Sequence, residues 1–193
     1  MLRHGSRHNW WHDDANGIIM PPAFRFLEIV FMVGTARSIV FRAFLLGVAT
    51  GMRSNMAGAA LAWHQPDAPR RAGWKTWPVL RNVWGRRALM LAGAGELVGD
   101  KLPITPSRLE PRSVIGRLLF GALAGAAIGT EARGKRAVLR GAFAGMIGAG
   151  IGTFGGYYAR KAVGEATGIP DPAIAMTEDA IAVTLATNAV ANR

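Results

Sequence analysis

Residues 141–159 form a segment of 19 residues without a charged side chain, and a regular stripe of glycines runs along it. The glycines recur every three or four residues, which places them on one face of a helix: Gly141, Gly145, Gly148, Gly152 and Gly156. At ~1.5 Å per residue, this helix spans about 28 Å, close to the hydrocarbon thickness of a bilayer. In water each helical glycine costs about 1 kcal/mol relative to alanine, whereas in lipid a glycine face lets a second backbone approach closely. The pattern predicts a membrane-spanning helix with a glycine zipper.

Two other apolar segments carry similar small-residue faces. Residues 43–63 are apolar apart from Arg53, and residues 114–130 are apolar apart from Arg117. Their glycines lie four or seven residues apart: Gly47, Gly51 and Gly58 in the first segment, and Gly121, Gly125 and Gly129 in the second. Only a short turn separates residues 114–130 from residues 137–159, so we expect these two segments to pair as a close antiparallel hairpin.

Two more segments complete the predicted domain. Residues 88–99 are too short to cross a bilayer alone, which indicates a re-entrant, tilted or broken helix. Residues 172–190 form an apolar helix that Asp171 can cap, with Pro172 in its first turn. The expected fold is all-α, an integral membrane bundle of four to five Gly-rich helices over residues 42–193. Lys and Arg divide almost evenly between alternate connections, so the positive-inside rule selects no orientation.

The N-terminal part of the chain differs from this bundle. Residues 1–23 are polar and irregular, and the Pro21-Pro22 pair separates them from the next segment. Residues 24–41 are mostly apolar but carry three charges, at Arg25, Glu28 and Arg37. We therefore expect residues 1–41 to form an arm followed by an amphipathic helix that lies in the membrane interface.

The basic charge lies mainly between the apolar segments. The formal net charge is +11, and half of the residues are hydrophobic. Four tryptophans accompany the Lys and Arg residues of the connection 64–87, as in the aromatic belt of a membrane interface: Trp63, Trp74, Trp77 and Trp84. Anionic lipid head groups are thus the expected partner, and no motif for nucleic acid is present. The absence of cysteine excludes disulfides, thiolate nucleophiles and Cys-metal sites.

A few charged residues fall within the apolar segments, where an isolated ion is expensive. They are Arg53, Glu96, Glu178 and Asp179, with Asp100 and Lys101 at the end of residues 88–99. One interpretation is structural: Arg53 pairs with Glu178, Asp179 or Glu96 and fixes the packing of the helices. The alternative is functional, because charges in spanning segments also mark the path of a proton, an ion or a small solute.

Three motif matches are better explained by structure. Gly150, Gly152 and Gly155 spell GxGxxG, but no strand precedes them and they lie inside the predicted helix. Residues 129–136 lack the final Ser/Thr of a phosphate-binding loop. The histidines at every fourth position near the N-terminus have no carboxylate to complete a metal site: His4, His8 and His12. We therefore predict no catalytic residue, no metal and no cofactor.

Three strings of sequence together resemble a known family. They are GVATGMRSNMAGAALA at 47–62, GELVGDKLPITPSRLEP at 95–111, and GTFGGYYARKAV with PDPAIAMTEDAIAV within 152–183. Over residues 42–190 the chain resembles the bacterial membrane proteins of the domain-of-unknown-function family 4126. The resemblance implies a multi-pass helical bundle in the bacterial inner membrane, and it implies no activity, cofactor or catalytic residue.

These observations favour a non-enzymatic membrane protein. We expect an accessory or structural subunit that packs through its glycine faces, in a homo-oligomer or in a larger bioenergetic or envelope complex. The alternative is a small ion or solute transporter or channel that uses Arg53, Glu96, Glu178 and Asp179. An enzyme acting on lipid head groups would need an exposed nucleophile at the interface, for which Ser107 is the candidate.

Overall fold

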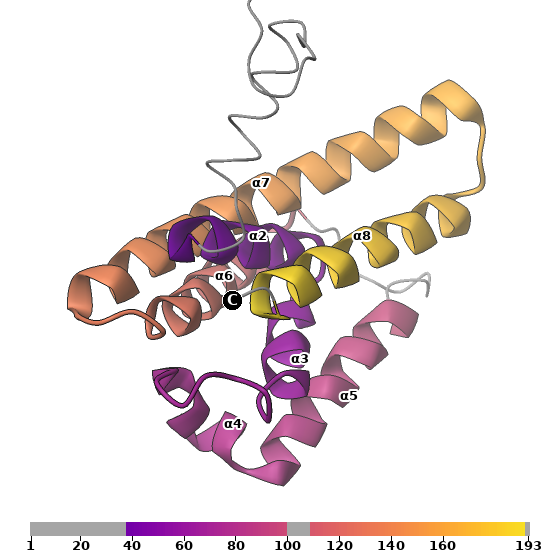
Figure 1. Ribbon diagram of the computed structural model, residues 1–193. Coiled ribbons are helices and arrows are strands. Elements are labelled where there is room, and N and C mark those ends of the chain that lie inside the picture. The colour runs from indigo at the N-terminus through magenta and orange to yellow at the C-terminus, as the bar shows by residue number, and fades with distance from the viewer. Residues whose placement is uncertain (1–37, 100–108, 192–193) are drawn as a thin grey trace, which may run out of the picture. The chain divides into compact units, whose positions relative to one another are not determined.

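The computed structural model describes residues 38–99 and 109–191, and all regular structure in these ranges is helical (Figure 1). The predicted all-α class is therefore confirmed for this part of the chain. The predicted interfacial helix at 24–41 lies outside it, apart from its last four residues. The elements are α2 (Ile39–Met52), α3 (Met56–Trp63), the 3-10 helix η1 (Gly73–Thr76), α4 (Pro78–Arg81), α5 (Val83–Gly99), α6 (Pro111–Gly129), α7 (Lys135–Thr167) and α8 (Asp171–Ala191).

Within the described ranges, two helices are long and apolar enough to cross a membrane. They are α6, with 19 residues, and α7, with 33 residues. Helix α2 is apolar but has only 14 residues. The structure thus supports two candidate spans, and the expectation of four to five stays a prediction.

Helix α7 lies between α6 and α2, and the three backbones touch at Gly145. A Cβ atom built on Gly145 would lie 2.1 Å from the carbonyl oxygen of Gly121 and 2.9 Å from Cα of Gly125. A Cβ atom on Gly47 would lie 2.1 Å from the carbonyl oxygen of Gly145 itself. Real Cβ atoms essentially never come closer than 3.0 Å to such atoms. No side chain therefore fits at this junction of three helices.

The other close contacts between helix backbones show whether the paired helices run parallel or antiparallel. Gly125 meets Gly141 and Gly129 meets Ala137, so α6 and α7 form the predicted antiparallel hairpin. Helices α2 and α7 are parallel, because a step of four residues along α2 corresponds to a step of four residues in the same direction along α7. Gly47 meets Gly145 and Gly51 meets Ala149, while Phe44 meets Gly148 and Val48 meets Gly152. All these contacts involve backbone atoms of the neighbouring helix, so there is no room for a side chain at any of these glycines.

Several glycines of the apolar segments do not make such backbone contacts, among them Gly58, Gly150, Gly155 and Gly156. A Cβ atom on Gly58 would meet only the side chain of Leu89, at 3.1 Å, and one on Gly156 would lie 2.9 Å from Oε1 of Glu178. At Gly150 the nearest atom is in the side chain of Leu118, at 3.6 Å, and Gly155 has nothing within 4 Å. The GxGxxG match thus lies within the continuous helix α7 and forms no phosphate-binding loop.

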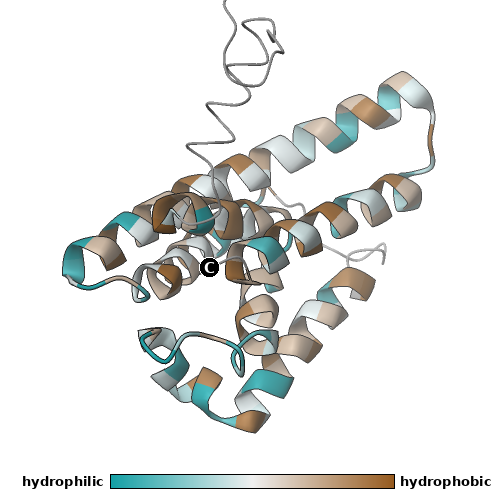
Figure 2. Ribbon diagram, in the orientation of Figure 1, coloured by the Kyte–Doolittle hydropathy of each residue, from teal (hydrophilic) through white to brown (hydrophobic). Residues whose placement is uncertain are grey.

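Most large apolar side chains of α6 and α7 point away from this glycine interior, whereas Ile128 of α6 is fully buried. On α7 they repeat every three or four residues and are 44% to 61% exposed: Leu139, Phe143, Ile147, Ile151, Phe154 and Tyr158. On α6 they are 52% to 61% exposed: Ile115, Leu119, Phe120 and Leu123. Figure 2 shows the resulting hydrophobic positions along the two helices. Small residues inside and large apolar residues outside are the reverse of a water-soluble bundle and typical of helices that pack in lipid.

The helix boundaries differ from the prediction in three places. Residues 43–63 were expected as one helix, but the chain breaks at Arg53 between α2 and α3. Residues 88–99 belong to a longer helix, α5, which starts at Val83. Helix α7 continues past Ala159 to Thr167, where Gly168 ends it in the left-handed conformation with φ of 65°.

Gly145→Ala is expected to destabilise the protein by about 3 kcal/mol, because the added methyl group overlaps the backbone of α6 and the helices must separate. Unfolding of the purified protein in detergent, followed by circular dichroism, measures this change.

Gly155→Ala is the matched control on the same helix. Its methyl group meets no other atom, so helix propensity alone predicts a neutral effect or stabilisation by up to about 1 kcal/mol. Equal destabilisation by the two variants would contradict the role assigned to the junction.

Candidate functional site

The break between α2 and α3 is the centre of the candidate site. Arg53 has an extended backbone, with φ of −140° and ψ of 112°, and α3 starts only at Met56. A helix that ends leaves carbonyl groups without partners, and a helix that begins leaves N–H groups without partners. The interior of the protein must therefore supply hydrogen-bonding groups on both sides of the break.

Two arginines supply donors to the end of α2. Arg117 from α6 donates from Nη1 to the carbonyl oxygen of Gly51, at 2.7 Å, and Arg53 donates from Nη1 to that of Met52, at 3.2 Å. Thr153 from α7 also donates to Gly51, at 3.2 Å. Both guanidinium groups are buried. Cations are favourable at this position because the C-terminal end of a helix carries partial negative charge.

A carboxylate supplies the acceptors for the start of α3. The two oxygens of Glu96, from α5, accept hydrogen bonds from the backbone N–H groups of Ser54 and Asn55, each at 2.7 Å. Glu96 was predicted as one of three possible partners for Arg53. The structure instead places it at the N-terminal end of α3, where a negative charge is favourable.

Arg53 forms ion pairs with both acidic residues of α8. Its Nε lies 2.6 Å from Oδ1 of Asp179, and its Nη2 lies 3.5 Å from Oε2 of Glu178. The Arg53 side chain is only 1% exposed. The structure thus brings together Arg53, Glu178 and Asp179 as the structural interpretation predicts. Asp100 and Lys101 lie outside the described residues.

The ion pairs continue from the interior to the surface through Arg160, which the sequence analysis missed, and Asp171, which it expected only as a helix cap. Arg160 of α7 lies 3.6 Å from Glu178 through Nη1, and its Nε donates to Asp171 at 2.6 Å. Side-chain exposure rises from 7% at Glu178 to 20% at Arg160 and 68% at Asp171. Arg160 was missed because α7 was expected to end at Ala159, one residue before it.

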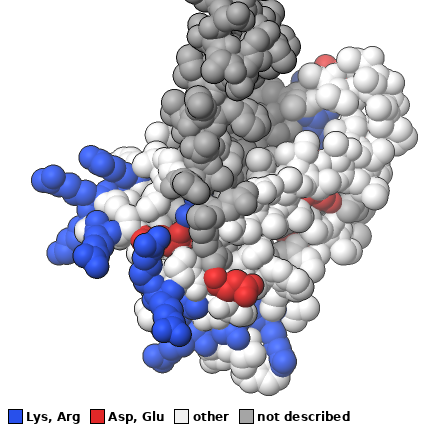
Figure 3. All heavy atoms as spheres, viewed as in Figure 1, with Lys and Arg blue, Asp and Glu red and all other residues white. Residues whose placement is uncertain are grey.

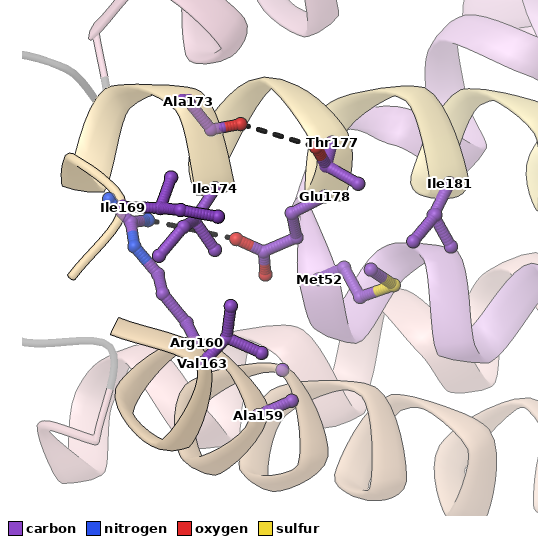
Figure 4. A pocket seen from close by; sticks show the side chains of 11 residues that line it. Met52, Ala159, Arg160, Val163, Ile169, Ala173, Ile174, Thr177, Glu178 and Ile181 are labelled. Atoms are coloured by element: carbon purple, nitrogen blue, oxygen red, sulfur yellow. Dashed lines mark hydrogen bonds and ion pairs between the residues drawn. The ribbon is translucent and has the colours of Figure 1, made fainter. Parts of the chain in front are cut away.

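A pocket of about 480 Å³ lies between the C-terminal half of α7 and the N-terminal half of α8. Most of its lining is apolar, and Figure 4 shows Glu178 pointing into it toward Arg160. Arg53 is not among the lining residues. Within the described ranges, no three His, Cys, Asp or Glu side chains are arranged to hold a metal ion. The arrangement can hold charges in place through its ion pairs.

A second buried cluster ties together four parts of the chain. Glu131, in the turn between α6 and α7, accepts from Nη1 of Arg42 at 2.6 Å and from Nε1 of Trp74 at 3.1 Å. Arg42 also donates from Nε to the carbonyl oxygen of Ala189, at the end of α8, at 2.7 Å. The one signal in the sequence was that Glu131 is the single acidic residue of a basic turn.

The structure corrects the expectation that Trp74 anchors the protein in the interface. Its side chain is fully buried, and its backbone N–H donates to Oγ1 of Thr130 at 3.0 Å. Trp63 and Trp84 are exposed by 70% and 68%, and Trp77 is half-buried. These three keep the position that an interface anchor needs, and Arg87 stacks on Trp84 at 4.9 Å from the ring centre.

No family model, curated protein or solved structure matches the chain. The resemblance to the domain-of-unknown-function family 4126 therefore stays a prediction.

Arg53→Gln is expected to destabilise the protein by about 3 to 5 kcal/mol, because it removes the buried positive charge that pairs with the carboxylates of Asp179 and Glu178. The measurement is detergent unfolding of the purified protein. Lys161→Gln is the control, since Lys161 is 60% exposed and its pair with Glu165 is long, at 4.0 Å; it should change stability little. Similar effects of both variants would contradict the structural role of the Arg53 cluster.

Glu131→Gln is expected to destabilise the protein by about 3 kcal/mol, because Arg42 then remains buried without a counter-charge. Glu165→Gln removes a carboxylate that is 69% exposed and is the control. Hydrogen exchange at α8 should also accelerate in the first variant, since Arg42 bonds to the end of that helix. Unchanged exchange there would argue against the cluster as the attachment of α8.

Proposed function

We propose that this chain is a non-enzymatic integral membrane protein that acts as an accessory or structural subunit. The observation that carries the proposal is the inverted packing of α6 and α7, with glycines at the helix contacts and exposed Leu, Ile and Phe side chains outside. In water these outer faces would be a large exposed apolar patch. In a bilayer they contact lipid chains or another membrane protein.

The glycine faces are buried within the protein, so a partner must bind a different surface from the one expected. The glycine faces were expected to contact a second chain, but in this protein α2, α6 and α7 use them against one another. We therefore assign contact with another subunit to the outer apolar face of α6 and α7. This face is rich in exposed bulky apolar side chains, which can make van der Waals contacts with a neighbouring helix or with lipid.

The charged residues also support a structural role. In membrane transporters, the free ends of broken helices bind the substrate or the coupled ion. In this chain the protein's own side chains occupy both ends of the break, Arg117 on the α2 side and Glu96 on the α3 side. A break that is closed in this way positions helices and offers no vacant end to a solute.

A transporter or channel is the second candidate, and one observation favours it. Glu178 is buried yet faces the pocket between α7 and α8, so a solute in that pocket reaches a charged residue within the bundle. This candidate predicts that proteoliposomes with the protein take up ions or small solutes. It also predicts that Glu178→Gln abolishes the uptake.

The test of the proposed function uses the absence of cysteine in the chain. Ile147→Cys, on the outer face of α7, is expected to form disulfide-linked dimers on mild oxidation in membranes if that face contacts a second copy. Leu91→Cys is the control, because Leu91 is 72% exposed but lies on α5. Light scattering in mild detergent should give a mass above the 20.5 kDa of one chain.

Two results would overturn the proposal separately. Extraction of the protein from membranes by alkaline carbonate would exclude the integral membrane location. A monomer in mild detergent, without cross-links through α6 or α7, would exclude the role as a subunit while leaving the membrane location intact.

A further inference from the structure

Two stretches of the chain carry basic residues and no acidic ones. Residues 70–87 include Arg70, Arg71, Lys75, Arg81, Arg86 and Arg87, and residues 133–140 include Arg133, Lys135, Arg136 and Arg140. Figure 3 shows Lys and Arg side chains gathered over the α4 and α5 region and over the turn between α6 and α7. One face of the molecule therefore attracts anions.

An apolar groove of about 370 Å³ lies beside the first of these stretches, between α3, α4, α5 and α6. Its walls include Leu61, Trp77, Leu80 and Leu89. It is open toward the outside, because Val79 of α4 and Phe120 and Leu123 of α6 line it and are more than half exposed. The volume lies within the ~300–1,000 Å³ typical of sites for small molecules.

Two cations lie close in the chain or in space to Leu80, a residue that lines the groove, although neither cation lines the groove itself. Arg81 directly follows Leu80 in the chain and is exposed, and Arg86 donates from Nη1 to the carbonyl oxygen of Leu80 at 3.2 Å. Trp77 lines the groove, and Trp84 lies close by along the chain. The apolar groove thus has the guanidinium group of Arg86 against its wall and the exposed Arg81 next to that wall in the chain, and guanidinium groups bind phosphate well through paired N–H donors.

We propose that this groove binds one anionic phospholipid, with an acyl chain between α4 and α6 and the phosphate group between Arg81 and Arg86. The proposal rests on the membrane location given above. A lipid fits both features at once, since it joins an apolar chain directly to an anionic head group. A second copy of the chain fits less well, because it would bring the same surplus of positive charge to the basic face.

The test is a titration of the purified full-length protein in detergent with dioleoylphosphatidylglycerol, followed by native mass spectrometry, with dioleoylphosphatidylcholine as the neutral comparison. The wild type is expected to retain one phosphatidylglycerol at least tenfold more tightly than phosphatidylcholine. Arg81→Gln/Arg86→Gln should weaken phosphatidylglycerol binding about 25-fold, about fivefold for each cation removed. The matched control, Arg133→Gln/Arg136→Gln, removes the same charge from the other basic stretch and should weaken it less than threefold.

A second pair of variants tests the groove itself. Val79→Trp fills the groove from an exposed position and should weaken binding of both lipids at least tenfold. Val83→Trp places the same side chain on α5 at a residue that does not line the groove, and it should leave binding unchanged. Circular dichroism verifies that each variant keeps its helix content.

Three outcomes would overturn the proposal. Equal losses in the two arginine pairs would show attraction to the whole basic face and no defined site. Unchanged binding in Val79→Trp, or equally tight binding of chain-free glycerophosphate, would exclude the groove. If alkaline carbonate leaves the protein in the membrane while phosphatidylglycerol binds no better than phosphatidylcholine, the lipid site fails and the membrane location stands.

Discussion

The architecture depends on the contact of three helix backbones at Gly145. Because a Cβ atom at this position would lie 2.1 Å from the carbonyl oxygen of Gly121, α6 and α7 can approach this closely only without a side chain between them. The interior then holds almost no large apolar side chains from these helices. Most Leu, Ile and Phe residues of α6 and α7 therefore face outward, with Ile128 as a buried exception, so the same contact that holds the bundle together also makes its surface apolar.

The close packing also explains where the charges lie. Helix α2 is held against α7 up to Gly51, and the chain breaks two residues later at Arg53. The carbonyl and N–H groups freed by the break need partners in the interior. Buried arginine and glutamate side chains need hydrogen bonds for the same reason. The backbone groups at the break and the buried charged side chains therefore supply hydrogen bonds to each other, and each would be unstable in the interior without the other.

Local patterns in the sequence predicted the elements that depend on local spacing. The glycine intervals identified the α6 and α7 hairpin, and the isolated charges identified Arg53 with Asp179 and Glu178. The break at Arg53 was not predictable in this way, because its partners Arg117 and Glu96 come from distant helices. Trp74 was misplaced for a related reason: a tryptophan in a basic connection resembles an interface anchor until Glu131, 57 residues away, provides a buried partner.

Helix α3 connects the break at Arg53 with the groove between α3, α4, α5 and α6. Ser54 and Asn55, which directly precede α3, donate their backbone N–H groups to the carboxylate of Glu96 in α5. The same two residues line the groove. Gly93 of α5 lies close to Ala59 of α3, where a Cβ atom would be 2.7 Å from the Cβ of Ala59. Helices α3 and α5 are therefore in close contact beside the groove, and one side chain, Glu96, links that contact to the break. The groove wall therefore includes the two residues that directly follow the break at Arg53, and the carboxylate of Glu96 fixes the backbone of both.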